Sequence, residues 1–478
     1  MSGQGQFGSA FAGKRALVMG LGVHGGGLGV ARFLAQQGAA VTVTDLRDAE
    51  QLAAPLRQLA DLPIRFVLGE HRESDFTDTD LVVRNPAVPR ESPLLAAARA
   101  AGVAVEMEMS LFFRLCPAPI IGVTGTKGKT TTTSLCAAML TAWKPYTVVA
   151  GNMGVSALEQ LPSITSTTPV VIELSSWQLE GMAEYGLSPH IAVATNLSPD
   201  HLNRYATMKA YADAKRGIVQ EQSVHDFAIL NRDDARVWAF GDDTPARILP
   251  FGLADGGGDG AWLAAGQLCW RFGGVAYAAP REILRLPGEH NAVDALAAGL
   301  AALALGAPFA AIEAGLAGFT GVKDRMELLG EFGGVEYIND TTATAPAAAA
   351  AAVAAMTRPT ILIAGGSEKH TDFADFAAVV APRVKAIVTL RGDSTPRLTD
   401  ELLRAGLDPA RLHGPVESMD AAVDAATALT GPGDVVLLSP ACASFGMFRN
   451  EFHRGDSFRA AVARIAAQTG EGRSWQRE

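Results

Sequence analysis

A turn rich in glycine, lysine and threonine restricts the possible folds of this chain more than any other feature of its sequence. It lies between an apolar segment at 120–123 and a helical pattern at 134–140. Backbone N–H groups in such a turn, together with the start of the following helix, bind phosphate oxygens. The sequence therefore predicts a phosphate loop within an α/β sheet. The loop consists of Gly125, Thr126, Lys127, Gly128, Lys129, Thr130 and Thr131.

Two side chains of this loop have the chemistry that a nucleoside triphosphate requires. The ammonium group of Lys129 would neutralise the β- and γ-phosphates, and the hydroxyl of Thr130 would ligate Mg²⁺. Val123 stands where a strict G-x-x-x-x-G-K-T motif has its first glycine, so the loop is a variant of that motif. We expect ATP and Mg²⁺ to bind here.

A second glycine turn, Gly20-x-Gly22-x-x-Gly25, follows an apolar segment at 15–19, and Asp45 ends the next predicted strand. The order strand, glycine turn, helix, strand is typical of a Rossmann-like nucleotide-binding unit. Alone, it would indicate a nicotinamide oxidoreductase, but that alternative leaves the phosphate loop unexplained. A tight turn with a purely structural function is the other interpretation.

Three polar side chains follow later strands of the unit that contains the phosphate loop. Glu173 ends the predicted strand 170–173, His201 follows the strand 191–196, and Lys215 lies in a helix beyond it. A carboxylate at a strand end suits the hard Mg²⁺ ion. Each residue alone has a structural explanation: a salt bridge, a capping group and a solvated lysine, respectively. Their order after a phosphate loop favours a metal site.

This combination resembles the Mur ligase family, the ATP-dependent enzymes that build the peptide of peptidoglycan, and relatives such as folylpolyglutamate synthase. The resemblance covers residues 14–465. It implies that Glu173 ligates one Mg²⁺ ion and His201 a second. It also implies that Lys215 is carbamylated by CO₂, which turns a cation into an acidic ligand.

The resemblance assigns further residues to ATP and to the nucleotide substrate. Asn291 in Gly288-Glu-His-Asn291 matches an asparagine near adenine, Arg325 an arginine on the phosphates, and Asp340 an acid on the ribose. Asn152 in Gly151-Asn152-Met-Gly154 matches the asparagine that contacts the reacting end of a muramoyl substrate. The residues that it places near the UDP part of that substrate are Gly22, Asp45 and Arg47.

The last third of the chain closely resembles the members of this family that add glutamate. The resemblance rests on residues 339–344 and 439–450, and the Asp-Tyr-Ala-His motif of the sister enzymes is absent. A lysine in the segment 365–369 matches the one that holds a carboxylate of the incoming glutamate. The residues implied in glutamate binding are Thr344, Lys369, Ser444 and Phe445.

Two positions depart from the pattern of the glutamate-adding members. Thr342 stands where a lysine is expected, which removes a cationic contact to the acyl phosphate that Lys127 could replace. Glu451 stands where an aromatic contact to the glutamate is expected, and Phe452 follows one position late. These departures leave the preference between D- and L-glutamate open.

The pattern of strands and helices predicts an α/β protein of three domains. We expect a Rossmann-like UDP-substrate domain at 1–117, a central P-loop ATPase-like domain at 118–322, and a Rossmann-like glutamate-binding domain at 323–478. The first boundary falls at the Pro-rich segment 116–119 and the second near 318–324.

Composition excludes several classes of partner. The net charge of −10 disfavours nucleic acid, and no apolar run is long enough for a membrane span. The N-terminus lacks the pattern of a signal peptide, and the four cysteines are scattered without a C-x-x-C pair. We expect a cytoplasmic monomer that acts on small molecules.

The function implied by the resemblance is amide-bond formation driven by ATP. Glutamate would be joined to UDP-N-acetylmuramoyl-L-alanine through an acyl-phosphate intermediate, in the synthesis of peptidoglycan precursors. Two other interpretations remain: a sister ligase that adds a different amino acid, and a non-catalytic nucleotide-binding module derived from such a ligase.

Overall fold

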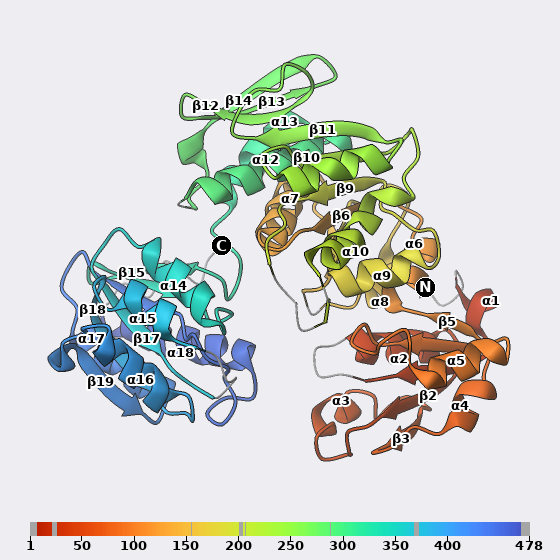
Figure 1. The fold of residues 1–478 in the computed structure, drawn as a ribbon, viewed down its shortest axis with the longest axis horizontal. Coiled ribbons are helices and arrows are strands. Elements are labelled where there is room, and N and C mark those ends of the chain that lie inside the picture. Colours follow the sequence, from red (N-terminus) through yellow and green to blue (C-terminus); the bar gives the residue numbers. More distant parts are fainter. Residues whose placement is uncertain are drawn as a thin grey trace. The chain divides into compact units, whose positions relative to one another are not determined.

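The computed structural model describes residues 7–21, 26–153, 155–199, 204–205, 207–286, 288–367 and 372–469. Its strands form three sheets, of five, nine and six strands, each flanked by helices (Figure 1). This arrangement confirms the predicted three-domain α/β architecture. The chain divides into two compact units, one of Met1–Arg285 with Glu289–Phe319 and the other of Leu286–Gly288 with Thr320–Glu478. The first unit contains the five- and nine-stranded sheets.

The five-stranded sheet is parallel, in the order β3-β2-β1-β4-β5. Successive residues of β1 face opposite sides: Val18 lies in a core with Phe33, and Leu17 lies in a core with Phe76. The chain reverses its winding between β1 and β4, which is where such sheets bind ligands. The strands are β1 (Arg15–Met19), β2 (Ala40–Asp45), β3 (Arg65–Leu68), β4 (Leu81–Arg84) and β5 (Ala104–Glu106); the helices are α1 (Gly8–Phe11), α2 (Gly26–Gln36), α3 (Ala53–Arg57), α4 (Glu73–Thr77), α5 (Pro93–Ala100) and α6 (Glu108–Leu115).

The nine-stranded sheet has the order β14-β13-β12-β11-β10-β9-β6-β8-β7. Strand β6, which leads into the phosphate loop, pairs in parallel with β8 on one side and β9 on the other. At the end of the sheet opposite β7, the strands β12, β13 and β14 pair in antiparallel fashion with one another. The sequence had not predicted these strands. The strands are β6 (Ile120–Thr124), β7 (Val148–Gly151), β8 (Val170–Glu173), β9 (Ile191–Ala194), β10 (Phe227–Asn231), β11 (Arg247–Gly252), β12 (Gly260–Ala264), β13 (Gln267–Phe272) and β14 (Val275–Pro280).

Helices of this region pack closely around the one that follows the phosphate loop. A Cβ atom at Gly315 of α13 would lie 2.4 Å from the Cα atom of Met139 in α7, so only glycine allows the two helices to approach so closely. The helices are α7 (Lys129–Trp143), α8 (Ala157–Gln160), α9 (Ser176–Ala183), α10 (Met208–Gln220), α11 (Ala235–Trp238), α12 (Glu289–Ala304) and α13 (Phe309–Gly318).

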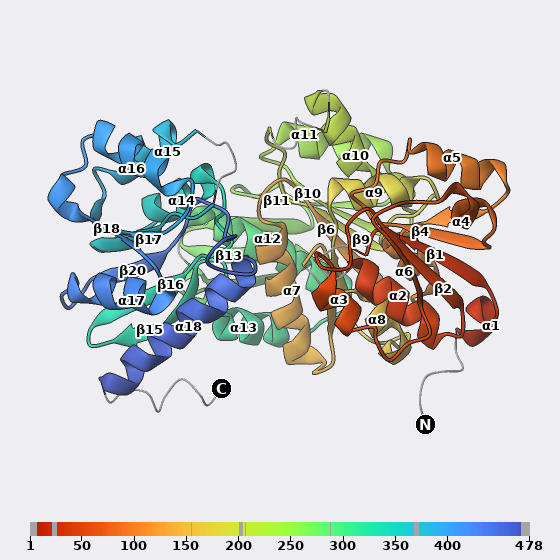
Figure 2. The same ribbon diagram turned by 90° about the horizontal axis from the view of Figure 1, so that it is seen from below.

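The six-stranded sheet has the order β15-β16-β20-β17-β18-β19 and is parallel except for β15. Figure 2 shows α14, α15 and α16 on one face of this sheet and α17 and α18 on the other. An alanine-rich run forms α14, and Pro346 is its first residue, a position that suits proline because its missing N–H would have no partner within the helix. The elements are β15 (Glu327–Phe332), β16 (Val335–Asn339), α14 (Pro346–Ala354), β17 (Thr360–Ala364), α15 (Ala374–Val380), β18 (Val384–Leu390), α16 (Thr395–Arg404), β19 (Leu412–Val416), α17 (Met419–Ala428), β20 (Val435–Leu438) and α18 (Glu451–Gln468).

No helix among the described residues is both long enough and apolar enough to cross a membrane.

Candidate active site

The phosphate loop has a backbone that only glycine can supply at two positions. Gly125 has a φ of +149°, and a Cβ atom there would lie 1.9 Å from Oγ1 of Thr195. Gly128 has a φ of +80°, and a Cβ atom there would lie 2.4 Å from Oδ1 of Asp294. The loop is therefore confined on both sides. A glycine-rich turn of this kind, followed directly by the start of α7, suits phosphate oxygens.

The ammonium group of Lys129 lies over this loop. Its Nζ donates to the carbonyl oxygens of Gly125 and Thr126, each at 3.0 Å. Lys129 is the first residue of α7, so the start of that helix and the cation lie together. Both features favour an anion at this place.

Side chains that follow β9 form hydrogen bonds with the backbone of the phosphate loop. Asn196 accepts from the amide of Lys127 at 2.9 Å through Oδ1, and donates to the carbonyl of Lys127 at 3.0 Å through Nδ2. Thr195 donates to the same carbonyl at 2.6 Å. Thr195, Asn196 and Asp294 were not recognised from the sequence, because they lie far from the motif along the chain.

Glu173 ends β8, next to the strand that leads into the loop, and is buried. Its Oε1 accepts from Nδ2 of Asn152 at 2.8 Å, and its carbonyl accepts from the amide of Asn152 at 2.9 Å. The other carboxylate oxygen, Oε2, is buried without a hydrogen-bond partner in the described residues. A buried carboxylate oxygen that protein groups leave unsatisfied fits a hard cation such as Mg²⁺.

Lys215 of α10 is brought to the same edge of the sheet. It is 2% exposed, and its Nζ lies 3.4 Å from Oγ1 of Thr124, the last residue of β6. The ring of Tyr211 lies 5.0 Å from the same nitrogen. Lys215 and Glu173 thus lie beside β6, the strand that leads into the phosphate loop, and their common metal site stays a prediction.

Of the other residues predicted for this region, some lie within the described residues and one does not. His201 lies outside the described residues, so its predicted metal contact stays a prediction. The described residues contain no group of three or more His, Cys, Asp and Glu side chains able to hold a metal ion. Asn291 lies at the start of α12, the helix that also carries Asp294 beside Gly128.

Asp45, at the end of β2, has a structural function in the first sheet. Its Oδ2 accepts from the amide of Leu21 and its Oδ1 from the amide of Arg47, both at 3.0 Å. The carboxylate therefore ties the start of the glycine turn to the next loop. Gly22 lies outside the described residues.

Asp340 follows β16 in the third sheet and is buried. Its Oδ2 accepts from the hydroxyl of Ser439 at 2.7 Å and its Oδ1 from the amide of Met326 at 3.2 Å. Burial raises the pKa of Asp340 to about 6. Arg325, also predicted for ATP, has an exposed side chain next to Met326.

The described residues that were predicted to bind glutamate lie in the loops after β16 and β20, which are neighbouring strands of the sheet. Ser444 is buried, Thr344 is half-buried, and Phe445 is 60% exposed. The amide of Ser367 donates to the carbonyl of Ala443 at 3.0 Å, which ties the β17 loop to the β20 loop. Lys369 lies outside the described residues.

The two departures also have structural positions. Thr342 donates its hydroxyl to the carbonyl of Asp324 at 2.9 Å, so it joins the loop after β16 to the segment before β15. This neutral contact stands where a lysine was expected to present a cation. Glu451 is the first residue of α18, and Phe452 beside it is 43% exposed.

Arg454 is a structural residue that the sequence did not reveal. It is fully buried, and its guanidinium donates to Oγ1 and the carbonyl of Thr341 at 3.0 and 2.8 Å and to the carbonyl of Cys442 at 3.1 Å. Burial lowers the pKa of the Arg454 guanidinium to about 10. It joins the loops after β16 and β20. The Arg454-Gly455 pair was noticeable only as part of a family motif.

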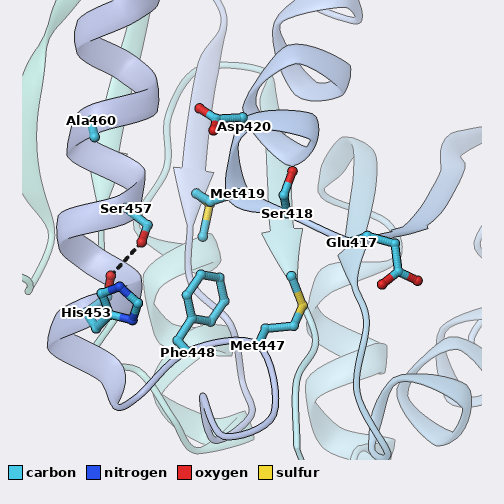
Figure 3. A pocket seen from close by; sticks show the side chains of 9 residues that line it. All are labelled: Glu417, Ser418, Met419, Asp420, Met447, Phe448, His453, Ser457 and Ala460. Atoms are coloured by element: carbon cyan, nitrogen blue, oxygen red, sulfur yellow. Dashed lines mark hydrogen bonds between the residues drawn. The ribbon is translucent and has the colours of Figure 1, made fainter.

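Two cavities lie away from these residues. One, of about 340 Å³, lies between α17 and α18 (Figure 3), where Met419, Met447 and Phe448 form an apolar floor beside His453. The second, of about 410 Å³, is lined by residues around 353–360 and 383–385. Neither cavity contains a predicted site residue, so the site is defined by the strand ends and the phosphate loop.

Three family models match the chain and together span most of its length. A Mur ligase MurD-like N-terminal domain matches residues 14–106, a Mur ligase middle domain matches 123–302, and a Mur ligase glutamate ligase domain matches 324–442.

Curated relatives match over nearly the whole chain. A UDP-N-acetylmuramoylalanine--D-glutamate ligase of Roseiflexus sp. (strain RS-1) is 53% identical over 94% of this chain and 98% of its own. Proteins of the same description from Symbiobacterium thermophilum and Geobacter metallireducens are 40% and 41% identical, over 95% and 96% of this chain and 98% and 99% of their own.

Solved structures share the fold. UDP-N-acetylmuramate-alanine ligase MurC of Thermotoga maritima gives a TM-score of 0.60 at 22% identity and covers 95% of this chain and 100% of its own. MurF of Acinetobacter baumannii gives 0.57 at 17% identity and covers 95% and 93%.

Proposed function

Because the chain belongs to the Mur ligase family, we infer that it is an ATP-dependent ligase that joins D-glutamate to UDP-N-acetylmuramoyl-L-alanine during peptidoglycan precursor synthesis. The observation that carries this function is the 53% identity, over 94% of the chain, to a relative of that description. The phosphate loop and the buried carboxylate beside it have the chemistry that the reaction requires.

The reaction has to activate a carboxylate, which is a poor acyl donor as an anion. An oxygen of the alanine carboxylate attacks the γ-phosphorus of ATP, ADP leaves, and an acyl phosphate forms. The deprotonated glutamate amine then attacks the acyl carbon, and phosphate leaves. Lys129 and the loop amides, already aimed at one place, would stabilise the charge that grows on the transferring phosphoryl group.

For Mg²⁺ we propose Thr130, Glu173, His201 and a carbamylated Lys215 as ligands, shared between two ions. When bound, Mg²⁺ would neutralise phosphoryl charge. The unsatisfied Oε2 of Glu173 supports a cation at this strand end. The burial of Lys215 supports the carbamate. Burying an unpaired ammonium group costs free energy, whereas a buried carbamate would be stabilised by the metal ion that it ligates.

The substrate contacts are proposals of the same kind. Gly22, Asp45 and Arg47 would bind the UDP part, and Asn152 the reacting end of the muramoyl substrate. Asn291, Arg325 and Asp340 would contact ATP. Thr344, Lys369, Ser444 and Phe445 would bind glutamate. We further propose domain boundaries at 117/118 and 322/323, a monomeric state and a cytoplasmic location.

The test is phosphate release from ATP in the presence of UDP-N-acetylmuramoyl-L-alanine and one amino acid at a time. We expect release with D-glutamate and little with L-glutamate or other amino acids. Release that requires a different amino acid would point to a sister ligase. No release with any of them would point to a non-catalytic module.

A further inference from the structure

A buried carboxylate lies where three helices of the first unit meet. Glu108 is the first residue of α6, just after the first sheet ends, and is 8% exposed. Helix α2 follows the glycine turn of that sheet, and α8 follows the turn that carries Asn152 in the second sheet. Glu108 therefore lies between the two turns that we propose to bind opposite ends of one substrate.

The carboxylate of Glu108 holds the chain that leaves the Asn152 turn. Its Oε1 accepts from the hydroxyl of Ser156 at 2.6 Å and from the amide of Ala157 at 2.9 Å. These groups start α8, whose first amides have no partners within the helix. A side chain from helix α6, which follows the first sheet, thus supplies the capping acceptor that α8 lacks locally.

Helix α2 packs against the same group of atoms. A Cβ atom at Gly26 would lie 3.4 Å from Oε2 of Glu108, and one at Gly29 would lie 2.2 Å from Cβ and Oγ of Ser156. The contact at Gly26 is an ordinary van der Waals distance, whereas glycine at position 29 is what allows α2 to approach so closely. A displacement of Ser156 would therefore change its contact with α2, the helix that follows the glycine turn.

The contacts continue from Ser156 to the proposed metal carboxylate. The amide of Gly151 donates to the carbonyl of Val155 at 3.1 Å, which closes the turn just before Ser156. Within that turn, Asn152 donates to Oε1 of Glu173 at 2.8 Å. Glu108 is thus connected to Asn152 and Glu173 through a short series of hydrogen bonds and packed atoms.

We propose that Glu108 is a positioning residue that sets Asn152 at the correct distance from the glycine turn for the muramoyl nucleotide. The inference rests on the proposed function, because it assumes that the two turns bind the two ends of that substrate. Glu108 contacts neither substrate nor metal in this proposal. It acts through Ser156 and Ala157.

A half-buried ion pair at the same junction provides a matched control. Nη1 of Arg32 in α2 lies 2.5 Å from Oε1 of Glu159 in α8, and both side chains are 27% exposed. This pair joins the same two helices but does not hold the start of α8. Glu159→Gln should therefore loosen the junction without displacing Asn152.

The experiment is calorimetric titration of the full chain, without ATP or metal, with UDP and with UDP-N-acetylmuramoyl-L-alanine. In Glu108→Ala we expect the Kd for the muramoyl nucleotide to rise about tenfold, because Asn152 is displaced, while the Kd for UDP stays within about twofold. Glu108→Gln keeps an oxygen acceptor and should stay within about threefold of the wild type for both ligands. Glu159→Gln should match the wild type.

Two results would overturn the proposal. One is an equal loss of affinity for UDP and for the muramoyl nucleotide in Glu108→Ala, which would make Glu108 a support of the glycine turn alone. The other is unchanged affinity for both ligands. If Glu108→Ala does not fold, Ser156→Ala, which removes one donor to the carboxylate, should show the same selective loss to a smaller degree. A wild-type chain that binds no muramoyl nucleotide would contradict the proposed function instead.

Discussion

At the scale of single residues, the satisfaction of hydrogen bonds, and not burial, separates side chains with a proposed chemical task from those that hold the fold. Lys215 and Glu173 are both about 2% exposed at one sheet edge, and the second has an oxygen without a partner in the described structure. Arg454 is equally buried, yet each of the three nitrogens of its guanidinium donates to an acceptor. An unsatisfied group next to a phosphate loop indicates a ligand, and a fully satisfied one indicates a structural function.

The proposed carbamate on Lys215 predicts chemical rescue. Lys215→Ala should lower kcat by about 100-fold or more, because an acidic metal ligand is lost, and added acetate or formate should restore part of the activity. Lys209→Ala is the control, since Lys209 lies on the same helix with an exposed side chain. Full activity of Lys215→Ala would contradict the carbamate.

The burial of Glu108 predicts a pH-dependent effect on stability. Desolvation raises the pKa of Glu108 from 4.5 to about 7; Glu159 of α8 adds to this rise, and Arg32 of α2 is paired with Glu159. Below pH 4.5 the carboxyl is protonated in both folded and unfolded chains. As the pH rises to about 7 the unfolded chain ionises first, so the folded state loses up to about 3 kcal/mol.

The measurement is urea denaturation of the wild type and Glu108→Gln between pH 4.5 and 8. The glutamine variant does not ionise, so its free energy of unfolding should gain on that of the wild type across this window and level off above pH 7. A difference between the two that does not change with pH would contradict the raised pKa.

At the scale of elements, the sequence predicted the parallel strands well and the antiparallel strands β12–β14 poorly. The apolar segments at 15–19 and 120–123 and the predicted strand at 170–173 lie within β1, β6 and β8. Parallel strands buried on both faces give continuous apolar runs that are easy to recognise. The strands β12–β14 are only partly buried and are separated by turns that contain glycine, so they give no continuous apolar run in the sequence.

The hydrogen bonds from Arg454 of α18 to the loops after β16 and β20 give a prediction at this scale. Arg454→Met should lower the free energy of unfolding by about 3–5 kcal/mol, because it leaves buried acceptors of Thr341 and Cys442 unpaired. The measurement is urea denaturation of the full chain. Arg464→Ala is the control on the same helix: Arg464 pairs only with exposed Asp420 and Asp424, so we expect a change within about 0.5 kcal/mol.

At the scale of the whole molecule, the sequence indicated which residues belong together but not what holds them there. It predicted that the phosphate loop, Glu173 and Lys215 share a site, because strand ends of a parallel sheet meet at one edge. It could not reveal Asn196, Asp294 or Glu108. Their contacts join segments far apart in the chain, and no local spacing reports such contacts.

The proposed binding of the uridine substrate at the first sheet and of the ATP phosphates at the second predicts independent effects of mutation. Asp45→Ala should raise the Michaelis constant for the uridine substrate about tenfold or more and leave that for ATP unchanged, because Asp45 ties the amides of Leu21 and Arg47. Asp48→Ala, in the same loop but exposed, should change neither constant. Equal effects of Asp45→Ala on both Michaelis constants would contradict this assignment.

The way in which Lys129 is held has a consequence for nucleotide affinity. A long, flexible side chain usually loses rotational freedom when it captures an anion, and that loss weakens binding. Here the carbonyls of Gly125 and Thr126 already restrain the ammonium, and Asn196 restrains the backbone beneath it. The ordering has therefore occurred during folding, and an arriving triphosphate exchanges two weak neutral acceptors for its own charged oxygens at little entropic cost.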